Sequence, residues 1–481
     1  MTILPDRIAQ TTFLLLVLAL PASAQTAHAK LDKSLRESVE QGCAGAQPVI
    51  ITAKPGHREA LRRALSAHGD VVQGEFPAIE AIAVDVHCDD LAALAAFDGT
   101  YAVSFNGPVS VQSVGRKGTG ARKGGAEGQA ASDLTKTFLA TMAVTPSIDN
   151  STGGSGIGVA VIDSGIGPGT DFDSRITAFY DFTRGDIRAV APLDPFGHGT
   201  HVAGLIGSEF VGLAPNARLI GLRVLNERGE GSTDDVVRAI EFAIINKNLL
   251  GIHILNLSLG HPIYESAATD PLVQAVEHAV REGLVVVASA GNFGVSRTTG
   301  EPGYAGIVSP GNAPSALTVG STRTFDTVSR LDDRVAPYSS RGPSWYDGFA
   351  KPDVVAPGDN LLSVAASDSA LRLAQERRGN TGNYMRLSGT SMAAGVTTGV
   401  VALVLQANRG LTPNTVKAIL EYSSIRVLGD DGKPVDALTQ GAGQIQAAGA
   451  LALARSIDPR ASVGSPWLSS GIVPSTTIGT R

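Results

Sequence analysis

The chain has 481 residues, which is too long for one small domain and sufficient for two. Hydrophobic residues make up 43% and charged residues 17%, so the chain can bury a large core without invoking disorder. The net charge of −6 and the pI of about 5.9 give no indication of nucleic-acid binding, because such proteins usually present a basic face.

The N-terminus has the pattern of a secretion signal. An apolar run from Phe13 to Leu20 is followed by Pro21 and the small residues Ala22 to Ala24. The run is too short to span a bilayer. We therefore predict a signal peptide at residues 1–24, cleavage after Ala24, no stable membrane anchor, and a secreted or periplasmic protein.

Cysteine is confined to the first part of the chain, at Cys43 and Cys88. Export makes a disulfide between them possible. Two buried free thiols are the alternative, and the sequence does not decide between the two. Because residues 89–481 contain no cysteine, thiol catalysis in the main domain is excluded.

Residues 48–105 have the pattern strand, helix, strand, strand, helix, strand. The strands are expected at 48–53, 71–76, 78–86 and 101–105, and the helices at 55–69 and 89–97, with Gly69 ending the first helix. This order is that of a ferredoxin-like split unit. We predict a small α+β domain at 45–110; about sixty residues make a marginal core when alone.

The segment after this domain has a different composition. Residues 114–133 are rich in Gly, Arg and Lys and contain almost no large apolar residues. This is typical of a flexible, exposed linker, which we place at 111–150. The basic residues could form a binding tail, but they more often belong to a solvated, protease-accessible hinge. Residues 456–481, rich in Ser, Pro, Gly and Thr, are expected to form a loose tail.

From about residue 155 the pattern becomes α/β. Four apolar runs bounded by turn signals are typical of parallel strands covered on both faces, at 158–163, 217–225, 252–258 and 284–292. Helices lie between them: one begins at Thr233, and another has Asp270 as its cap, Pro271 at its first position and Gly283 at its end. We therefore predict a doubly wound parallel sheet with helices on both faces over residues 151–455.

Polar residues collect where these strands end. In open α/β sheets, ligands bind beyond the carboxyl ends of the strands. The first run ends in Asp163, the third in Asn256 and Ser258, and the fourth in Asn292. Each residue alone could simply make a turn. Three such ends at corresponding edges favour a functional site.

Two further polar residues stand at the beginnings of apolar helices. The stretch DPFGHGTHVAG places His198 after a glycine turn, and SGTSMAAG places Ser391 in the first turn of a helix that is apolar almost all round. That helix is too short and too rich in Thr and Gly for a membrane span. The free N–H groups and dipole of a helix N-terminus favour developing negative charge. Ser391 could instead be a cap, but Thr390 can serve that purpose.

A nucleophilic serine needs a base, and the base needs a group that holds it. No histidine follows Ser391, which excludes the Ser–acid–His order of the α/β-hydrolases. The order that remains is Asp163, His198, Ser391. His198 and His201 could together bind a metal, but H-E-x-x-H, a nearby cysteine and an obvious third ligand are all missing from the sequence. We therefore predict no metal site and assign His201 a structural hydrogen bond.

These residues lie in motifs that resemble those of the subtilisin-like serine endopeptidases, the subtilases. The motifs follow the family order and spacing: VAVIDSGI around Asp163, HGTHVAG from His198, NLSLG from Asn256, SAGN ending at Asn292, and SGTSMA around Ser391. The β-α-β-β-α-β unit resembles the inhibitory prodomain of these enzymes. The resemblance covers most of the chain and leaves out the signal, the linker and the tail.

The resemblance implies a role for each of these residues. Ser391 would attack the scissile carbonyl, His198 would transfer its proton, and Asp163 would hold the imidazole. The side chain of Asn292 and the N–H of Ser391 would bind the oxyanion. Substrate would pair with Ser258, Leu259 and Gly260 on one side and with the segment of Gly229 and Gly231 on the other, and Ser289, Ala290 and Gly291 would help wall the first specificity pocket. Ser309-Pro310 matches a site where the family often has a cis proline.

The chain departs from the family pattern in two places. Gly395 stands where the family usually has proline, so we expect lower stability and a reduced rate; a crippled peptide-binding relative is the alternative. The loop 204–215 offers only Ser208 and Glu209 as side-chain ligands, too few for a tight calcium site. We expect no cofactor for the chemistry.

The sequence thus predicts a monomeric serine endopeptidase made as a self-processing zymogen. Its partners would be polypeptide substrates and its own prodomain, and autocleavage is expected within residues 106–150. A plain α/β binding domain would leave Asp163, His198, Asn292 and Ser391 together unexplained.

Overall fold

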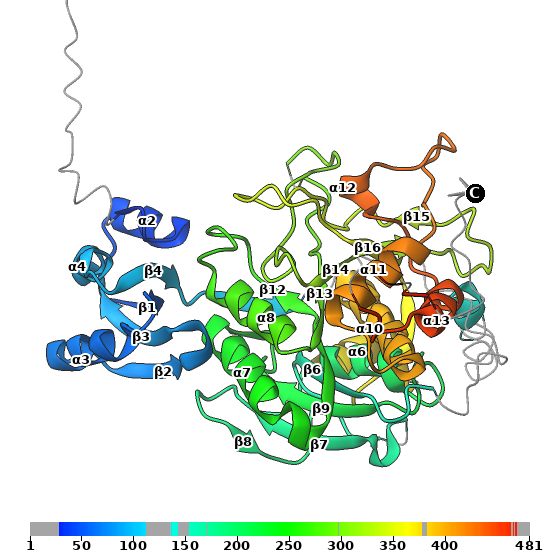
Figure 1. Ribbon diagram of the computed structural model, residues 1–481, viewed down its shortest axis with the longest axis horizontal. Coiled ribbons are helices and arrows are strands. Elements are labelled where there is room, and N and C mark those ends of the chain that lie inside the picture. The colour runs from blue at the N-terminus through cyan, green and yellow to red at the C-terminus, as the bar shows by residue number, and fades with distance from the viewer. Residues whose placement is uncertain are drawn as a thin grey trace, which may run out of the picture.

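The computed structural model describes residues 28–111, 135, 137–142, 153–169, 171–296, 298–377, 382–462, 465 and 467–468. The predicted signal peptide, most of the predicted linker and most of the predicted tail lie outside these residues. The described chain forms a small N-terminal unit with its own core, residues 28–107, and a larger domain whose core includes Met142 and residues from 153 onward (Figure 1).

The N-terminal unit is an antiparallel sheet with two helices between its strands. The sheet has the order β2-β3-β1-β4, and the elements follow one another as β-α-β-β-α-β. Gly69, in the left-handed conformation with φ 97°, ends the first of these helices. The elements are β1 (Ala46–Ala53), α3 (Arg58–His68), β2 (Val72–Phe76), β3 (Ala81–His87), α4 (Leu91–Ala96) and β4 (Thr100–Phe105).

Two features of this unit were not predicted from the sequence. A further helix, α2 (Lys33–Glu40), precedes the sheet, so the unit begins before residue 45. Its N-terminus is capped by Asp32, whose carboxylate accepts from the N–H of Leu35. Cys43, just after α2, forms a disulfide with Cys88, which settles in favour of a bridge the alternative that the sequence left open.

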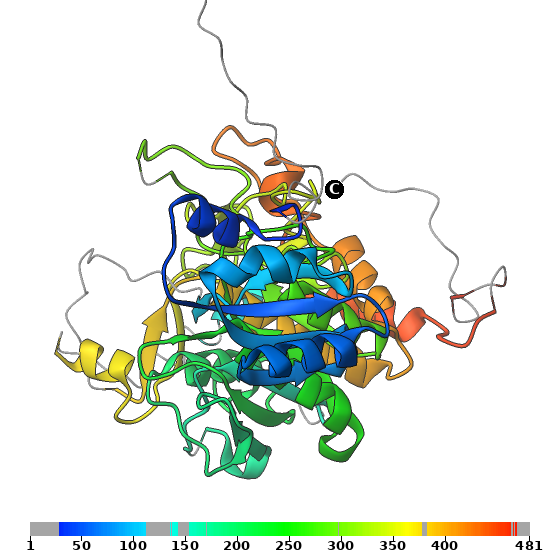
Figure 2. The same cartoon turned by 90° about the vertical axis from the view of Figure 1, so that its left-hand side faces the viewer.

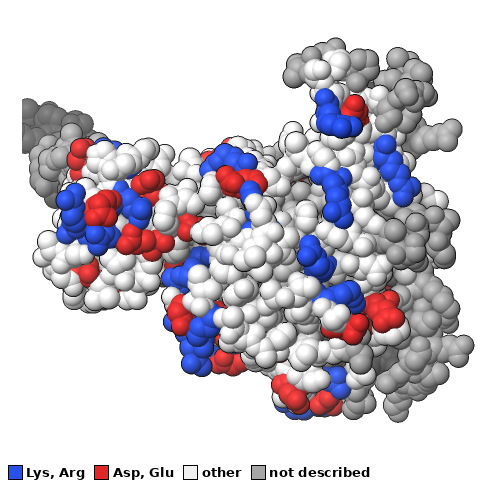
Figure 3. Space-filling model, turned by 60° about the horizontal axis from the view of Figure 1, so that its bottom comes forward, with Lys and Arg blue, Asp and Glu red and all other residues white. Residues whose placement is uncertain are grey.

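The N-terminal unit lies against the part of the larger domain that carries α7 (Thr233–Leu250) and α8 (Pro271–Arg281), as Figure 2 shows from the side of that unit. On the face in Figure 3, its acidic and basic side chains lie beside one another, and the unit does not present a surface of one sign there.

The larger domain is built on a nine-stranded sheet whose central strands are parallel. The order is β15-β14-β13-β11-β6-β9-β7-β8, and β16 also pairs with β14. The strands β8 and β15 are antiparallel to their neighbours. The prediction of a parallel sheet is therefore wrong for these two strands. The strands are β6 (Gly158–Asp163), β7 (Ile176–Asp181), β8 (Arg188–Ala189), β9 (Arg218–Arg223), β11 (Ile252–Leu257), β13 (Val285–Ser289), β14 (Leu317–Arg323), β15 (Arg334–Val335) and β16 (Val354–Pro357).

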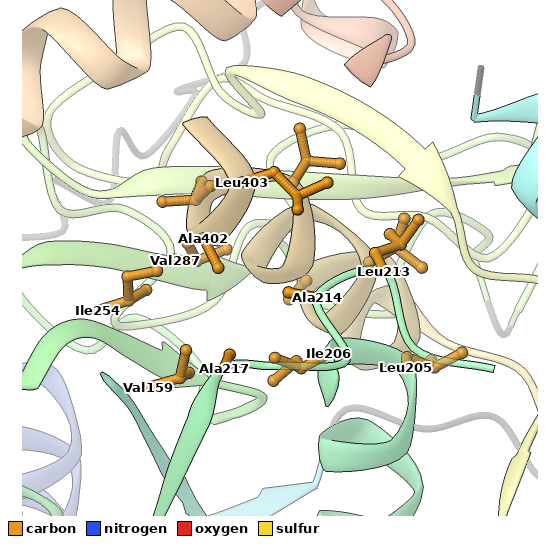
Figure 4. Packing of buried hydrophobic residues seen from close by; sticks show 14 of the residues in the cluster. Val159, Leu205, Ile206, Leu213, Ala214, Ala217, Ile254, Val287, Ala402 and Leu403 are labelled. Atoms are coloured by element: carbon orange, nitrogen blue, oxygen red, sulfur yellow. The ribbon is translucent and has the colours of Figure 1, made fainter. Parts of the chain in front are cut away.

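Helices cover both faces of this sheet, as predicted. Because side chains alternate along a strand, Val159 and Val161 of β6 join a hydrophobic cluster on one face, and Ala160 and Ile162 join the cluster on the other. The first cluster contains residues of α6 (His198–Gly207), α10 (Thr390–Ala407), α11 (Pro413–Ser423) and α13 (Ala447–Ser456); the second contains residues of α7 and α8. Figure 4 shows part of the first cluster, where strand residues Val159, Ile254 and Val287 lie beside helix residues Leu205, Ile206, Ala402 and Leu403.

Helix α10 lies at the centre of the first cluster. It is the one described helix that is long and apolar enough to cross a membrane, but 89% of its 18-residue window is buried within the protein. It is therefore a core helix, as expected from its Thr and Gly content. The remaining described elements are β17 (Leu361–Val364), β18 (Tyr384–Leu387), α9 (Ala370–Glu376) and α12 (Ala437–Gln440).

A small three-stranded sheet joins the two parts of the molecule. The strand β5 (Pro108–Val111) follows the N-terminal unit directly and lies between β10 (Glu230–Ser232) and β12 (Leu259–Gly260) of the larger domain. Both pairings are antiparallel. The last strand predicted for the N-terminal unit ends at residue 105, and β5 was not predicted.

Candidate active site

The predicted site residues meet at one edge of the large sheet. Strands β13, β11 and β6 are parallel neighbours, so their carboxyl ends lie side by side. Asp163 is the last residue of β6, and Ser258 and Asn292 follow β11 and β13. His198 is the first residue of α6, and Ser391 is the second residue of α10.

Asp163 and His198 form a fully buried pair. His198 Nδ1 lies 2.8 Å from Oδ1 and 3.0 Å from Oδ2 of Asp163, and both side chains have 0% exposure. The N–H of Ser164 also donates to Asp163 Oδ1, at 2.7 Å. Because the carboxylate can only accept, the imidazole carries its proton on Nδ1, which leaves the lone pair on Nε2.

A second buried carboxylate, Asp194, holds the beginning of α6 and was missed by the sequence analysis. Its Oδ1 accepts from Gly197 N–H at 2.7 Å and from the Ser164 hydroxyl at 2.8 Å, and its Oδ2 accepts from Thr200 N–H at 2.8 Å. Burial raises the pKa of the Asp194 carboxyl, and these hydrogen bonds oppose that shift. Asp194 thereby fixes both the turn before His198 and the residue after Asp163. Its position four residues before His198, next to a proline, was the available signal.

Ser391 stands at the start of the buried helix α10. Its Oγ donates to the carbonyl oxygen of Ser258 at 2.9 Å, and the Ser258 hydroxyl donates to the carbonyl oxygen of Ser391 at 3.2 Å. His198 Nε2 is buried and has no hydrogen-bond partner among the residues that the structure describes. The contact between Asp163 and His198 is therefore formed in this structure, whereas Ser391 and His198 are not hydrogen-bonded.

The two helices that carry His198 and Ser391 pack closely near their first turns. Gly395 follows Ser391 by four residues, and Val202 follows His198 by four. A Cβ atom placed on Gly395 would lie 3.3 Å from both the carbonyl oxygen and Cγ1 of Val202. The glycine therefore has a packing reason: it allows α10 to approach the backbone of α6. From the sequence, this glycine was predicted only to make the helix more flexible.

Asn292 lies beside the N-terminus of α10 with one half of its amide engaged. Its Oδ1 accepts from the N–H of Thr390 at 3.1 Å and from the Thr390 hydroxyl at 3.2 Å. Its Nδ2 is buried and makes no hydrogen bond within the described part of the chain. Thr390 is thus the first residue of the helix, and the prediction that it serves as the cap was wrong. The cap position is Gly389, which has no side-chain capping bond. The Nδ2 group of Asn292 can therefore donate a hydrogen bond to an oxygen atom of another molecule.

His201, one turn after His198, has a different environment. Its Nε2 lies 3.2 Å from the carbonyl oxygen of Leu361 and 3.1 Å from that of Met385. Burial, and next the nearby His198, lower the pKa of His201 to about 3. This ring is therefore neutral at ordinary pH and donates to the backbone, which is the structural role predicted for it.

The residues predicted to bind substrate form the two outer strands of the small sheet. Leu259 and Gly260 of β12 pair with Val111 and Ser110 of β5, and Gly231 of β10 pairs with Val109. The carbonyl oxygen of Gly229 accepts from Val111 N–H at 3.2 Å. The predicted edges thus hold an extended strand between them, and that strand belongs to the same chain.

The segment 289–291 lies next to this sheet. The segment of Val308 and Ser309 connects it to the residue that follows β12. Val308 N–H donates to the carbonyl oxygen of Ala290 at 3.1 Å, and Ser309 N–H donates to that of His261 at 2.9 Å. Cβ atoms placed on Gly260 and Gly291 would lie 2.9 Å from Cγ2 and 2.8 Å from Cγ1 of Val308. The Val308 side chain, 1% exposed, therefore stands between the two glycine walls. The Ser309-Pro310 peptide bond is cis, as predicted.

Within the described ranges, no group of three or more His, Cys, Asp or Glu side chains is arranged to hold a metal ion. In the loop 204–215, the Ser208 hydroxyl donates to Asp171 Oδ1 at 2.7 Å.

Comparisons with known proteins identify the family. Residues 154–449 match the model of the subtilase family. The serine protease AprX of Bacillus subtilis (strain 168) is 39% identical over 306 residues, which cover 61% of this chain and 66% of that protein. The alkaline serine exoprotease A of Vibrio alginolyticus is 32% identical over 274 residues, covering 56% of this chain and 42% of that protein. Subtilisin DY of Bacillus licheniformis is 32% identical over 282 residues, covering 58% of this chain and 86% of that protein.

A solved structure shows the same fold. Fervidolysin from Fervidobacterium pennivorans, described as a keratinolytic enzyme related to subtilisin, aligns with a TM-score of 0.66 and 23% identity, covering 85% of this chain and 61% of that chain. The family and the relatives' names support a serine endopeptidase. Both the motifs in the sequence and the matched family model lead to one conclusion: this chain belongs to the subtilase family.

Proposed function

We propose that the protein is a serine endopeptidase in which Asp163, His198 and Ser391 form the catalytic triad. The observation that carries this proposal is the buried pair of Asp163 and His198, whose outward nitrogen Nε2 has no partner among the described residues. This nitrogen belongs to the first residue of α6. The close approach of Gly395 in α10 to Val202 in α6, each four residues after Ser391 and His198, supports the placement of the two helix starts near each other. An unpaired acceptor on a buried imidazole costs free energy, and a catalytic role explains why such a cost is retained.

The chemistry follows from these groups. Rotation of the Ser391 side chain away from the Ser258 carbonyl turns its hydroxyl toward His198 Nε2. Nε2 takes the hydroxyl proton while Oγ bonds to the substrate carbonyl carbon, and Asp163 stabilises the imidazolium that forms. The imidazolium then donates its proton to the departing amine as the peptide bond breaks. Water hydrolyses the resulting acyl-enzyme by the same sequence of proton transfers.

The oxyanion is stabilised by two donors. Asn292 Nδ2 is buried and makes no hydrogen bond to a described residue, while Oδ1 of the same amide is fixed by Thr390. This fixed orientation means that the donor needs no reorganisation when charge develops on the substrate oxygen. The N–H of Ser391, at the N-terminus of α10, is the second donor, and the helix dipole favours negative charge at this point.

The N-terminal unit is proposed to act as an inhibitory prodomain. The strand that follows it directly, β5, occupies the position between β10 and β12 in which a substrate strand would lie. This arrangement is that expected of a zymogen that cleaves its own chain shortly after β5. The apolar run at the N-terminus and the disulfide between Cys43 and Cys88 favour export to an oxidising compartment.

The proposal is tested by comparing the precursor with its Ser391→Ala variant. The wild-type chain is expected to shorten on a gel and to digest casein, and the variant is expected to stay at full length and leave casein intact. Self-shortening without casein digestion would favour the crippled relative that Gly395 suggested. Identical behaviour of the two proteins would contradict both. His201→Asn serves as a matched control, because it alters a buried histidine in the same helix that takes no part in the chemistry.

A further inference from the structure

The N-terminal unit and the larger domain share an interface in which apolar side chains of the unit, such as Ile50 and Phe76, pack with those of α7 and α8, and polar groups of α7 add hydrogen bonds. The amide of Asn106 donates to Asp234 Oδ1 at 2.9 Å, and the N–H of Asp234 donates back to Asn106 Oδ1 at 3.0 Å. The carbonyl oxygen of Gly107 accepts from Thr233 N–H at 3.1 Å. The N–H groups at the start of α7 are therefore satisfied by the N-terminal unit while the two parts are in contact.

One carboxylate of α7 is covered by this contact. Glu241 Oε1 accepts from the N–H of Ala78, in the turn after β2, at 3.1 Å. The side chain belongs to the larger domain, its partner belongs to the N-terminal unit, and the residue is only 9% exposed. Removal of the N-terminal unit would therefore expose the carboxyl group to water.

Few positive charges offset the effect of burial on the pKa of Glu241. Within the described ranges, the charged group whose field reaches it is Arg58 of α3. Arg58 is itself paired with Glu75 of β2, and Arg238, on α7 itself, is paired with Asp234 and Asp235. Burial raises the pKa of Glu241 to about 7, and neither the Ala78 hydrogen bond nor Arg58 cancels this effect.

A second carboxyl group lies at the same interface, beyond β12. Lys33 N–H of the N-terminal unit donates to the carbonyl oxygen of Tyr264 at 3.0 Å, which places Glu265 beside that unit. Burial, and next the negative charges of Asp270 and of Asp32 from the opposite part, raise the pKa of Glu265 to about 8. Asp32 in turn is held by the N–H groups of Leu35 and Phe105 and is acted on by Arg36 and His261. The half-buried Glu265 of the larger domain and the buried Asp32 of the N-terminal unit thus act on each other across the interface.

We propose that this interface is a pH-dependent latch: the N-terminal unit stays docked while Glu241 and Glu265 are protonated, and a rise in pH releases it by ionising them. The release of a docked inhibitor is how this latch would regulate the peptidase, and that consequence rests on the proposed function. The docking equilibrium itself does not, because it concerns only contact between the two parts.

The direction follows from linkage. A carboxyl group whose pKa is higher in the docked state than in the open state favours docking at low pH, and this contribution is lost as pH rises through the docked pKa. For Glu241 the change from its ordinary value of 4.5 to about 7 sets the window. If the whole pKa shift is lost on opening, ionisation of Glu241 weakens docking about 300-fold. We expect a weakening of at least tenfold, because water still reaches part of the site.

The experiment uses the full chain carrying Ser391→Ala, which removes the proposed nucleophile. Hydrogen exchange at Ala78 N–H and across α7 is measured at pH 5 and pH 8.5, with each rate corrected for its intrinsic pH dependence. The opening constant is expected to rise at least tenfold at the higher pH. Glu241→Gln and, separately, Glu265→Gln keep the shape but remain neutral, so each should reduce that rise, and the double variant should abolish it.

Asp333→Asn is the matched control. Asp333 is a buried carboxyl with a pKa raised to about 6, chiefly by burial, but it contacts Gln444 inside the larger domain and not the interface. It should leave the pH dependence of Ala78 exchange unchanged. Equal protection of Ala78 at pH 5 and pH 8.5, or an unchanged rise in the double Gln variant with native circular dichroism, would overturn the proposal. A wild-type chain that fails to digest casein would count against the proposed function alone.

Discussion

The glycine at position 395 gives a sharp test of how the two helices of the active site are held together. We consider Gly395→Ala, made in the Ser391→Ala background for stability measurements and in the wild type for activity. In a helix interior, alanine is favoured over glycine by about 1 kcal/mol because glycine has more conformational freedom to lose. If nothing else changed, the substitution would stabilise the protein by that amount.

The structure predicts the opposite sign. The new Cβ atom would lie 3.3 Å from both the carbonyl oxygen and Cγ1 of Val202, which is tighter than ordinary van der Waals contact, and the backbone of α6 cannot rotate away. Overpacking of this kind costs about 1–3 kcal/mol. The net effect is a loss of about 1 kcal/mol, which corresponds to a fall in Tm of about 2–4 °C. Because relief requires α6 to shift against α10, His198 moves relative to Ser391, and kcat/KM should fall several-fold.

Thermal unfolding and peptide hydrolysis measure the two effects. Gly303→Ala is the control, because its added Cβ would have no neighbour closer than 3.7 Å. It should change Tm and kcat/KM little. If Gly395→Ala instead raised Tm and kept full activity, the close approach of the helices would not constrain the site, and the glycine would be only a weak point in α10.

Three further predictions concern single side chains. Asn292→Ala should lower kcat by about 10²–10³ with little change in KM, a scale borrowed from the loss of one oxyanion donor in subtilisin. An increase in KM of the same size with unchanged kcat would argue against the oxyanion role. His201 has its pKa lowered to about 3 by burial, so its contribution to stability is lost as pH falls below its ordinary 6.5; urea unfolding should show a loss of about 3 kcal/mol from this residue between pH 7 and pH 4, absent in His201→Gln. Val308→Gly should open the space between Gly260 and Gly291, so the ratio of kcat/KM for phenylalanine over alanine before the cleaved bond should rise at least tenfold; an unchanged ratio would place the specificity pocket elsewhere.

Much of the fold could be predicted because its signals are local. The apolar runs at 158–163, 252–258 and 284–292 are continuous, and the caps at Asp270 and Gly69 are single residues with known geometry. These runs also order the strand ends, which is why Asp163 and Asn292 could be placed at one edge of the sheet. The antiparallel edge strands β8 and β15 have only two residues each, too few to produce a pattern.

The parts that escaped prediction depend on contacts between distant segments. β5 has four residues and becomes a strand because β10 and β12 lie on either side of it. Asp194 stands in a stretch that reads as a turn, and its role appears only when Ser164 and Thr200 converge on it. Thr390 has the chemistry of a cap, but its hydroxyl donates to Asn292 in the folded protein. Pairing and convergence of this kind leave no periodic trace in a single sequence.

The reactivity of Ser391 tests the central claim most directly. The full chain is treated with an alkyl fluorophosphonate, which phosphonylates a serine only when a neighbouring base activates it, and the adduct is located by peptide mass mapping. We predict one adduct, on Ser391, that disappears in His198→Ala and is retained in His201→Asn. An unlabelled Ser391 in a folded wild-type chain from which the N-terminal unit has been released, or labelling that persists in His198→Ala, would contradict the account.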